Sequence, residues 1–327
     1  MLIRSNGTAT YVAKDIANQM WKFGILGLDF RYRPYLLQQN GQELITSDTY
    51  HGSSSNQYGH ADRVINVIDI RQKYLQDVLR ISLHKLGFIK EAKNSIHFGY
   101  EVVALSAAAA KELGVNVEDG EEKDVYAMAG RKGIGVKADD LVDRVIAKAT
   151  EEVAKRHPEQ AEEDNRHLGQ QIAVAAIRYY MIRYNMNSII VFDFAEALNM
   201  QGNTGPYLQY AHARANNILE RARSQGAEPS YLLPAGFTLS DPEKLLIKWM
   251  NELPEAVANA AENLAPSAMT EYVYQLASCF MSFYETTSVM NAESAEIRAF
   301  RLGLVDAYRS ILKQSLTMLG IPAPTRM

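Results

Sequence analysis

The chain has 327 residues, of which 47% are hydrophobic and 22% are charged, a balance typical of a globular protein with two or more packed units. The formal net charge of −4 argues against a protein that holds nucleic acid through overall basicity, so any RNA contact has to be local. No apolar run reaches the length of a membrane span, the N-terminus lacks a secretory signal, and the single cysteine, Cys279, excludes an internal disulfide. We therefore expect a cytoplasmic protein without a membrane segment or a metal site, in which Cys279 is packed in a core.

The first sixty residues predict a short hairpin, a helix and a long insertion. Two short strand-like segments flank Asn6-Gly7, a dipeptide whose tolerance of positive φ suits a tight turn. Apolar residues then recur at helical spacing from Ala13 to Phe23. Residues 27–61 are rich in Gln, Asn, Ser, Gly and Tyr, which indicates a long, partly mobile insertion.

A strand, a helix and a second strand follow, in the order of an α/β domain. Residues 63–69 form a β-branched run, residues 72–86 have helical periodicity, and residues 96–103 are again strand-like. Residues up to about 135 therefore predict part of a nucleotide-binding α/β layer.

Helices dominate the remainder of the chain. Asp139-Asp140 open an amphipathic helix, since acids in the first turn suit the helix dipole. Pro158 ends this helix. Further helices are predicted over residues 166–186, 206–225, 242–251, 255–263, 268–286 and 294–319. The C-terminal third is therefore expected to be a helix bundle.

Tyr11 and Asp15 stand four residues apart, where the second strand of the hairpin gives way to the helix. A carboxylate beside a phenol suits a guanidinium ligand, because a planar fork of donors bonds the acid while the ring covers its face. The spacing alone also fits an exposed acid at a helix start. The run Ser5-Asn6-Gly7-Thr8-Ala9-Thr10-Tyr11, followed by Lys14-Asp15-Ile16, resembles the segment with which arginyl-tRNA synthetases bind their amino acid. The resemblance implies that Tyr11 and Asp15 bind arginine.

A second arginine contact is implied by the same resemblance. The run Val67-Ile68-Asp69-Ile70-Arg71-Gln72 is similar to the family's segment with a substrate-binding glutamine, so Gln72 is expected to bind arginine. Leu75 replaces a histidine that is common in the family. By itself, Gln72 also fits an exposed residue at the start of a helix.

Arg131 and Lys132 lie among the three glycines of residues 128–135. By themselves they fit a solvated basic turn, although a glycine-rich backbone could bring Lys132 onto phosphates. The segment resembles the mobile loop of class I synthetases, whose lysine stabilises the triphosphate while the adenylate forms. The resemblance implies that both cations contact phosphate, and Ala129 stands where a serine is usual.

The segment Gly202–Arg214 begins a helix with two distinct faces. Tyr207, Tyr210 and Arg214 align on one face, which suits stacking on unpaired bases and contact with phosphate, and which also suits packing against a neighbouring helix. The segment is nearly the signature at the entry to the family's anticodon-binding domain, so these three residues are implied to contact tRNA. The other face is apolar and consists of Leu208, Ala211, Ala215, Ile218, Leu219 and Ala222.

The last helices and the terminus also resemble the family. In the family the aromatic pair matched by Phe283-Tyr284 and the terminal methionine matched by Met327 lie near the anticodon loop. Tyr284 and Met327 are therefore implied to contact RNA, with packing as the alternative interpretation.

Taken over the whole chain, the resemblance implies an α/β, partial Rossmann-like catalytic domain followed by an all-α, helix-bundle anticodon-binding domain. The expected divisions are 1–138 for the catalytic part, 139–200 for a helical connector that contacts the tRNA stem, and 201–327 for anticodon binding. The implied substrates are L-arginine, ATP with Mg²⁺, and arginine tRNA, which react through arginyl-adenylate.

The sequence also contains no His-x-Gly-His segment, with which class I synthetases clamp ATP. We therefore expect the N-terminal half of the catalytic domain to be a missing partner, and this chain alone to lack arginine-dependent ATP–pyrophosphate exchange. Two alternatives are a non-catalytic RNA-binding paralogue and a helical adaptor that binds no RNA.

Overall fold

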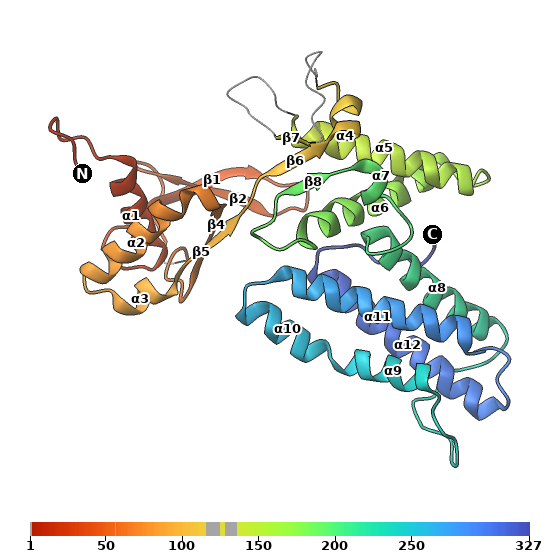
Figure 1. Ribbon diagram of the computed structural model, residues 1–327. Helices are drawn as coiled ribbons and strands as arrows, with labels where there is room; N and C mark the ends of the chain where they lie inside the picture. Colours follow the sequence, from red (N-terminus) through yellow and green to blue (C-terminus); the bar gives the residue numbers. More distant parts are fainter. Residues whose placement is uncertain (1, 56, 116–124, 128–135) are drawn as a thin grey trace. The chain divides into compact units, whose positions relative to one another are not determined.

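The computed structural model describes residues 2–55, 57–115, 125–127 and 136–327 (Figure 1). The chain divides into two compact units, Met1–Glu101 and Val102–Met327. Each has its own buried core. No helix in the described ranges combines the length and apolarity that a membrane crossing requires.

The first unit begins with a tight turn and a helix, as predicted. Gly7 has a positive φ of 82°, but the expected hairpin is reduced to one bridge, between Ile3 and Ala9. Helix α1 (Tyr11–Lys22) starts at Thr10, whose Oγ1 accepts a hydrogen bond from the Ala13 N–H.

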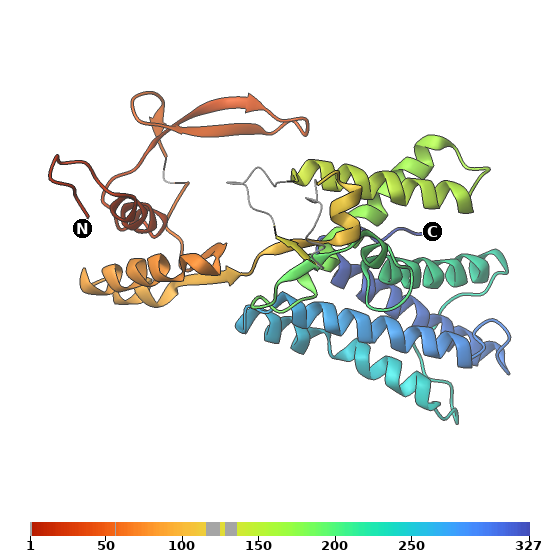
Figure 2. The same ribbon diagram turned by 45° about the horizontal axis from the view of Figure 1, so that its top comes forward.

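Within the expected insertion at residues 27–61, three strands form an antiparallel sheet with strand order β2-β1-β3, which was not predicted from the sequence. Its strands are β1 (Arg31–Leu37), β2 (Glu43–Asp48) and β3 (Ser53–Ser54). Figure 2 shows β1 and β2 lying antiparallel as a long ribbon. Almost every residue of β1 is exposed, so the strand lacks the alternation of apolar and polar residues that would have identified it.

The predicted α/β order of the first unit is confirmed. Parallel strands β4 (Val64–Asp69) and β5 (Ser95–Tyr100) pair in register over six residues. Between them the chain passes through the 3-10 turn η1 (Ile70–Gln72) and two helices, α2 (Lys73–Lys85) and α3 (Ile89–Asn94). The small core of this unit contains Phe23, Val64, Leu83 and Ala92.

The second unit opens with a small sheet covered by helices. Strand β6 (Val103–Ser106) pairs antiparallel with β7 (Val125–Ala127) and parallel with β8 (Ile190–Phe192). Strand β8 was not predictable from the sequence, because three residues are too few to show a period. The helices are α4 (Ala107–Glu112), α5 (Ala138–Arg156), α6 (Glu162–Ile182) and α7 (Phe194–Ala197), with α5 and α6 side by side (Figure 1).

The remainder is the predicted helix bundle. Helices α8 and α11 pack against α12, and α11 also packs against α9 and α10 (Figures 1 and 2). Gly205, at the start of α8, lies so close to the Ala175 carbonyl of α6 that a Cβ there would overlap it. The bounds are α8 (Gly205–Ser224), α9 (Asp241–Asn251), α10 (Leu253–Glu262), α11 (Pro266–Thr286) and α12 (Ala295–Met318).

Candidate functional site

The first candidate site is a cavity of about 290 Å³ within the first unit, which we call the α1 cavity. Helix α1 supplies one wall, and strand β4, η1 and α2 supply the others. The lining residues are Asp15, Asn18, Gln19, Lys22, Asn66, Ile68, Gln72, Leu75, Gln76 and Leu79.

A hydrogen-bonded group of polar side chains forms the floor of the α1 cavity. Asn66 donates to Gln76 Oε1 at 3.0 Å and to Gln19 Oε1 at 3.3 Å, and it accepts from Lys22 Nζ at 3.0 Å. Gln19 in turn donates to Ser95 Oγ at 2.9 Å. Because Gln19 and Asn66 are buried and bonded, this floor is rigid.

Two of the three predicted arginine-binding residues line the α1 cavity. Asp15 and Gln72 reach it from α1 and from the end of η1. Within the described ranges no hydrogen bond or ion pair engages the Asp15 carboxylate, which leaves it available to a cationic ligand. Tyr11 lies one turn earlier on the same face of α1, is 80% exposed, and does not line the cavity.

Asp69 fixes the turn that carries Gln72. Its carboxylate accepts from the Arg71 backbone N–H at 2.8 Å and from Arg71 Nε at 2.9 Å. These hydrogen bonds lower the pKa of Asp69 to about 2, so the carboxylate is ionised at neutral pH. Gln19, Asn66 and Asp69 were not predicted as site residues. Two signals in the sequence could have identified the first two: Gln19 is a polar residue within the apolar stripe of a helix, and Asn66 is a polar residue within a β-branched strand.

The second candidate site is a cavity of about 620 Å³ within the second unit, which we call the α8 cavity. Helix α8 forms one side, and the end of α11 with the residues after it forms the other. The lining residues are Tyr210, Ala213, Arg214, Asn217, Ile218, Arg221, Tyr284, Glu285, Thr287, Ser288, Val289, Met290 and Met327.

Arg214 contacts two aromatic rings in the α8 cavity. Its guanidinium lies 4.7 Å from the Tyr210 ring centroid and 4.5 Å from that of Tyr284. It also donates to the Tyr210 hydroxyl and, at 3.7 Å, to Met281 Sδ. Two rings and a cation around an open space match the stacking and phosphate contacts of a single-stranded nucleic acid.

The other predicted site residues have different surroundings. Met327 lines the α8 cavity, whereas Tyr207 does not: it is half-buried, and its ring lies 5.9 Å from that of Tyr274. Burial raises the pKa of Tyr207 above its ordinary value. The predicted phosphate-binding residues Arg131 and Lys132 lie outside the described residues.

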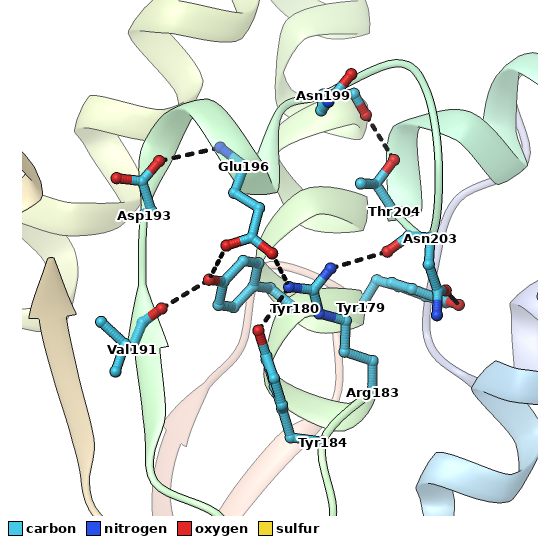
Figure 3. A network of polar contacts seen from close by, with 10 residues as sticks. All are labelled: Tyr179, Tyr180, Arg183, Tyr184, Val191, Asp193, Glu196, Asn199, Asn203 and Thr204. Carbon is cyan, nitrogen blue, oxygen red and sulfur yellow. Dashed lines mark hydrogen bonds and ion pairs between the residues drawn. The ribbon is translucent and has the colours of Figure 1, made fainter.

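A polar network fixes the loop that leads into α8 (Figure 3). The Arg183 guanidinium lies 4.3 Å from the Tyr180 ring and 4.7 Å from the Tyr184 ring, and it pairs with the Glu196 carboxylate. It also donates to the Asn203 carbonyl at 2.9 Å. The network thereby connects α6 and α7 to the residue just before the α8 N-cap.

A third face of α8 holds the end of the chain, which we call the C-terminal strap, residues 321–327. Gln209 Nε2 donates to the Pro322 carbonyl at 2.9 Å, His212 Nδ1 to the Pro324 carbonyl at 2.9 Å, and Asn216 Nδ2 to the Thr325 carbonyl at 3.3 Å. All three side chains are buried. The sequence pattern predicts only two faces for this helix, so this third face was not predicted.

His212 makes the stability of this unit dependent on pH. Burial lowers the pKa of His212 below its ordinary 6.5, against the opposing hydrogen bond to Pro324, and Arg309 and Lys313 lower it further. In the unfolded chain His212 therefore binds a proton near pH 6.5, whereas in the folded chain it binds one only at a lower pH. The stability that neutral His212 contributes is complete above pH 6.5 and declines as the pH falls, by at most about 1.4 kcal/mol per pH unit.

We expect the variant His212→Asn, whose amide can still donate a hydrogen bond, to differ less from wild type in denaturant midpoint at pH 5.0 than at pH 7.5. An equal difference in midpoint at the two pH values would contradict this expectation.

Comparison with known proteins matches two domain models to the chain. The tRNA synthetases class I (R) catalytic domain model matches residues 38–194, and the DALR anticodon binding domain model matches residues 208–327. The arginine–tRNA ligase of Pyrococcus abyssi is 36% identical to this chain; the match covers 100% of this chain and 49% of the ligase. The arginine–tRNA ligase of Thermus thermophilus is 34% identical, and the match covers 100% of this chain and 51% of that ligase. The solved Thermus thermophilus arginyl-tRNA synthetase matches with a TM-score of 0.83 at 33% identity, over 100% of this chain and 50% of that one. The chain belongs to the arginyl-tRNA synthetase family. It spans about half the length of the curated relatives it matches.

Membership of the arginyl-tRNA synthetase family confirms the predicted fold class, a partial class I catalytic domain followed by a helical anticodon-binding domain. The α8 cavity is built from residues within the DALR match. The α1 cavity takes its β4, η1 and α2 residues from the catalytic match, while α1 precedes it. The boundaries at 138/139 and 200/201 and the roles of individual site residues remain predictions.

Proposed function

We propose that this chain acts within an arginine–tRNA ligase, holding L-arginine in the α1 cavity and the anticodon loop of arginine tRNA in the α8 cavity. In that reaction an arginine carboxylate oxygen attacks the α-phosphorus of ATP and pyrophosphate leaves, forming arginyl-adenylate. A hydroxyl of the terminal tRNA ribose then displaces AMP. ATP enters with Mg²⁺, and Lys132 and Arg131 are proposed to contact its phosphates. The proposed compartment is the cytoplasm, where tRNA is charged.

The observation that carries the proposal is the contact of Arg214 with both the Tyr210 and the Tyr284 rings in a cavity of the anticodon-domain match. An overall charge of −4 would repel RNA, so binding has to rely on a local group of this kind. The direct experiment is to measure binding of arginine-tRNA transcript by the 327-residue chain, against a transcript with a changed anticodon. Equal binding of the two transcripts would refute anticodon recognition.

Asp15 is proposed to pair with the guanidinium of arginine. We expect Asp15→Asn to weaken arginine binding more than tenfold, because a hydrogen bond to a charged group contributes about 1.5–3 kcal/mol. Gln72→Ala removes a neutral partner and is expected to have a smaller effect. Arginine binding is measured by ligand-observed NMR titration of the 327-residue chain.

Asp62→Asn is the matched control, since it removes the same charge from the same unit at a side chain that is 99% exposed and outside the cavity. Arginine binding that survives Asp15→Asn would contradict the assigned role.

A non-catalytic RNA-binding paralogue is the second candidate function. It needs the α8 cavity but has no use for the α1 cavity. Its distinguishing outcome is anticodon-dependent tRNA binding by a chain that does not bind arginine. The Asp15 carboxylate, which has no partner among the described residues and lines a cavity with a rigid polar floor, favours the ligase.

A further inference from the structure

The C-terminal strap is held against α8 by hydrogen bonds from three buried side chains. Gln209, His212 and Asn216 recur at three- and four-residue spacing, so they form one row along α8, and each is at most 6% exposed. Each donates to a different strap carbonyl. Burying three polar side chains is costly unless each is hydrogen-bonded, so the strap and this row stabilise each other.

The sequence of the strap makes it stiff. Pro322 and Pro324 have fixed φ and no backbone N–H, so these residues offer the row only carbonyl acceptors. Ile321 is 3% exposed, and Ala323 packs on the same core. The strap therefore begins at a buried residue, Ile321, and has little freedom to move along α8.

The strap ends in a wall between two cavities. Met327 lines the α8 cavity, and it also lines a second cavity of about 400 Å³ bounded by α5, α6 and α7. On the α8 side it faces the same space as Arg214 and Tyr284. Its position therefore limits how far a base stacked in the α8 cavity can extend.

We propose that Gln209, His212 and Asn216 are positioning residues for RNA recognition, which set the width of the α8 cavity by holding the strap and hence Met327. The inference rests on the proposed anticodon-loop binding in that cavity. Helix α8 then has three tasks on three faces: core packing, contact with RNA, and placement of the wall that the RNA meets. The row touches no RNA itself, and its effect on recognition passes through the strap.

The test uses the discrimination ratio, which is the Kd for a transcript with one changed anticodon base divided by the Kd for arginine-tRNA transcript. A loss of folded protein lowers both affinities alike and leaves this ratio unchanged. We expect Asn216→Ala, which frees the Thr325 carbonyl, to lower the ratio about fivefold or more. Deleting Met327 should lower it similarly while keeping all three anchoring hydrogen bonds, so this variant tests the wall even if Asn216→Ala folds poorly.

Two further variants complete the experiment. Met318→Ala trims another methionine, 49% exposed at the end of α12, and should leave the ratio at the wild-type value. Release of Met327 by carboxypeptidase should be faster in Asn216→Ala than in wild type, which reports loosening of the strap. An unchanged ratio in the Met327 deletion, or in a folded Asn216→Ala, would overturn the inference and leave the proposed function intact. Anticodon-independent binding by the wild type would overturn both.

Discussion

Replacing Arg214 with alanine is expected to weaken binding of arginine-tRNA transcript by about 5- to 150-fold, because a lost stacking contact costs roughly 1–3 kcal/mol. The guanidinium contacts both the Tyr210 and the Tyr284 rings, so its removal takes away a cation and the planar group that both rings contact. Arg214→Lys should recover little of the loss, since an ammonium keeps the charge but not the planar surface. The measurement is a filter-binding titration at several salt concentrations.

Arg223→Ala is the matched control for Arg214→Ala. Arg223 lies on the same helix, is exposed, and does not line the α8 cavity, so it reports the loss of one positive charge alone. We expect a small effect that disappears at high salt. If Arg223→Ala and Arg214→Ala weakened binding equally, the α8 cavity would not be the RNA site.

How far the sequence could be interpreted is clearest on α8. The apolar face was predicted because burial leaves a strong helical period, and Leu208, Ala211 and Ala215 are indeed fully buried. The face with Tyr210 and Arg214 was predicted as well, although Tyr207 proved to pack against the bundle. The face that holds the strap was not predicted. Its hydrogen-bond partners are backbone carbonyls more than 100 residues away in the sequence, so the local residue pattern of α8 carries no information about them.

The first unit gives a similar lesson. The four-residue spacing of Tyr11 and Asp15 placed both on one face of α1, and the structure brings Asp15 and Gln72 to the same cavity. Spacing cannot predict the polar floor, since Gln19 and Asn66 meet only once β4 packs on α1. It also could not predict β1, because an exposed strand has no buried side to impose a period.

The largest expected loss of stability comes from the buried ion pair between Arg301 and Glu243. Arg301 Nε lies 2.8 Å from Glu243 Oε1, and the two side chains are 9% and 0% exposed. The Ser240 backbone N–H also donates to Glu243 Oε2 at 2.7 Å, so this carboxylate caps α9 as well. Arg301→Leu leaves a buried charge without its partner, which should lower the free energy of unfolding by roughly 3–5 kcal/mol. The measurement is urea denaturation at pH 7.

Lys244→Leu is the control on the same helix. Lys244 pairs with Asp241, but the side chains are 57% and 97% exposed, so we expect a loss below about 1 kcal/mol. A similar cost for both variants would contradict the burial argument.

The pH dependence of the Arg301→Leu cost separates lost charge pairing from lost packing. Burial alone would raise the pKa of Glu243, but hydrogen bonds from Arg301 and Ser240 outweigh it and hold the pKa below its ordinary 4.5. In wild type the stabilisation from Glu243 is therefore complete above pH 4.5 and is lost as the pH falls through the lower folded value. Without Arg301, burial is opposed only by Ser240, so the carboxyl should bind a proton at higher pH and relieve the unpaired charge. The difference between wild type and Arg301→Leu should consequently shrink from pH 7 to pH 4, whereas a cost due only to a lost side-chain volume would stay constant.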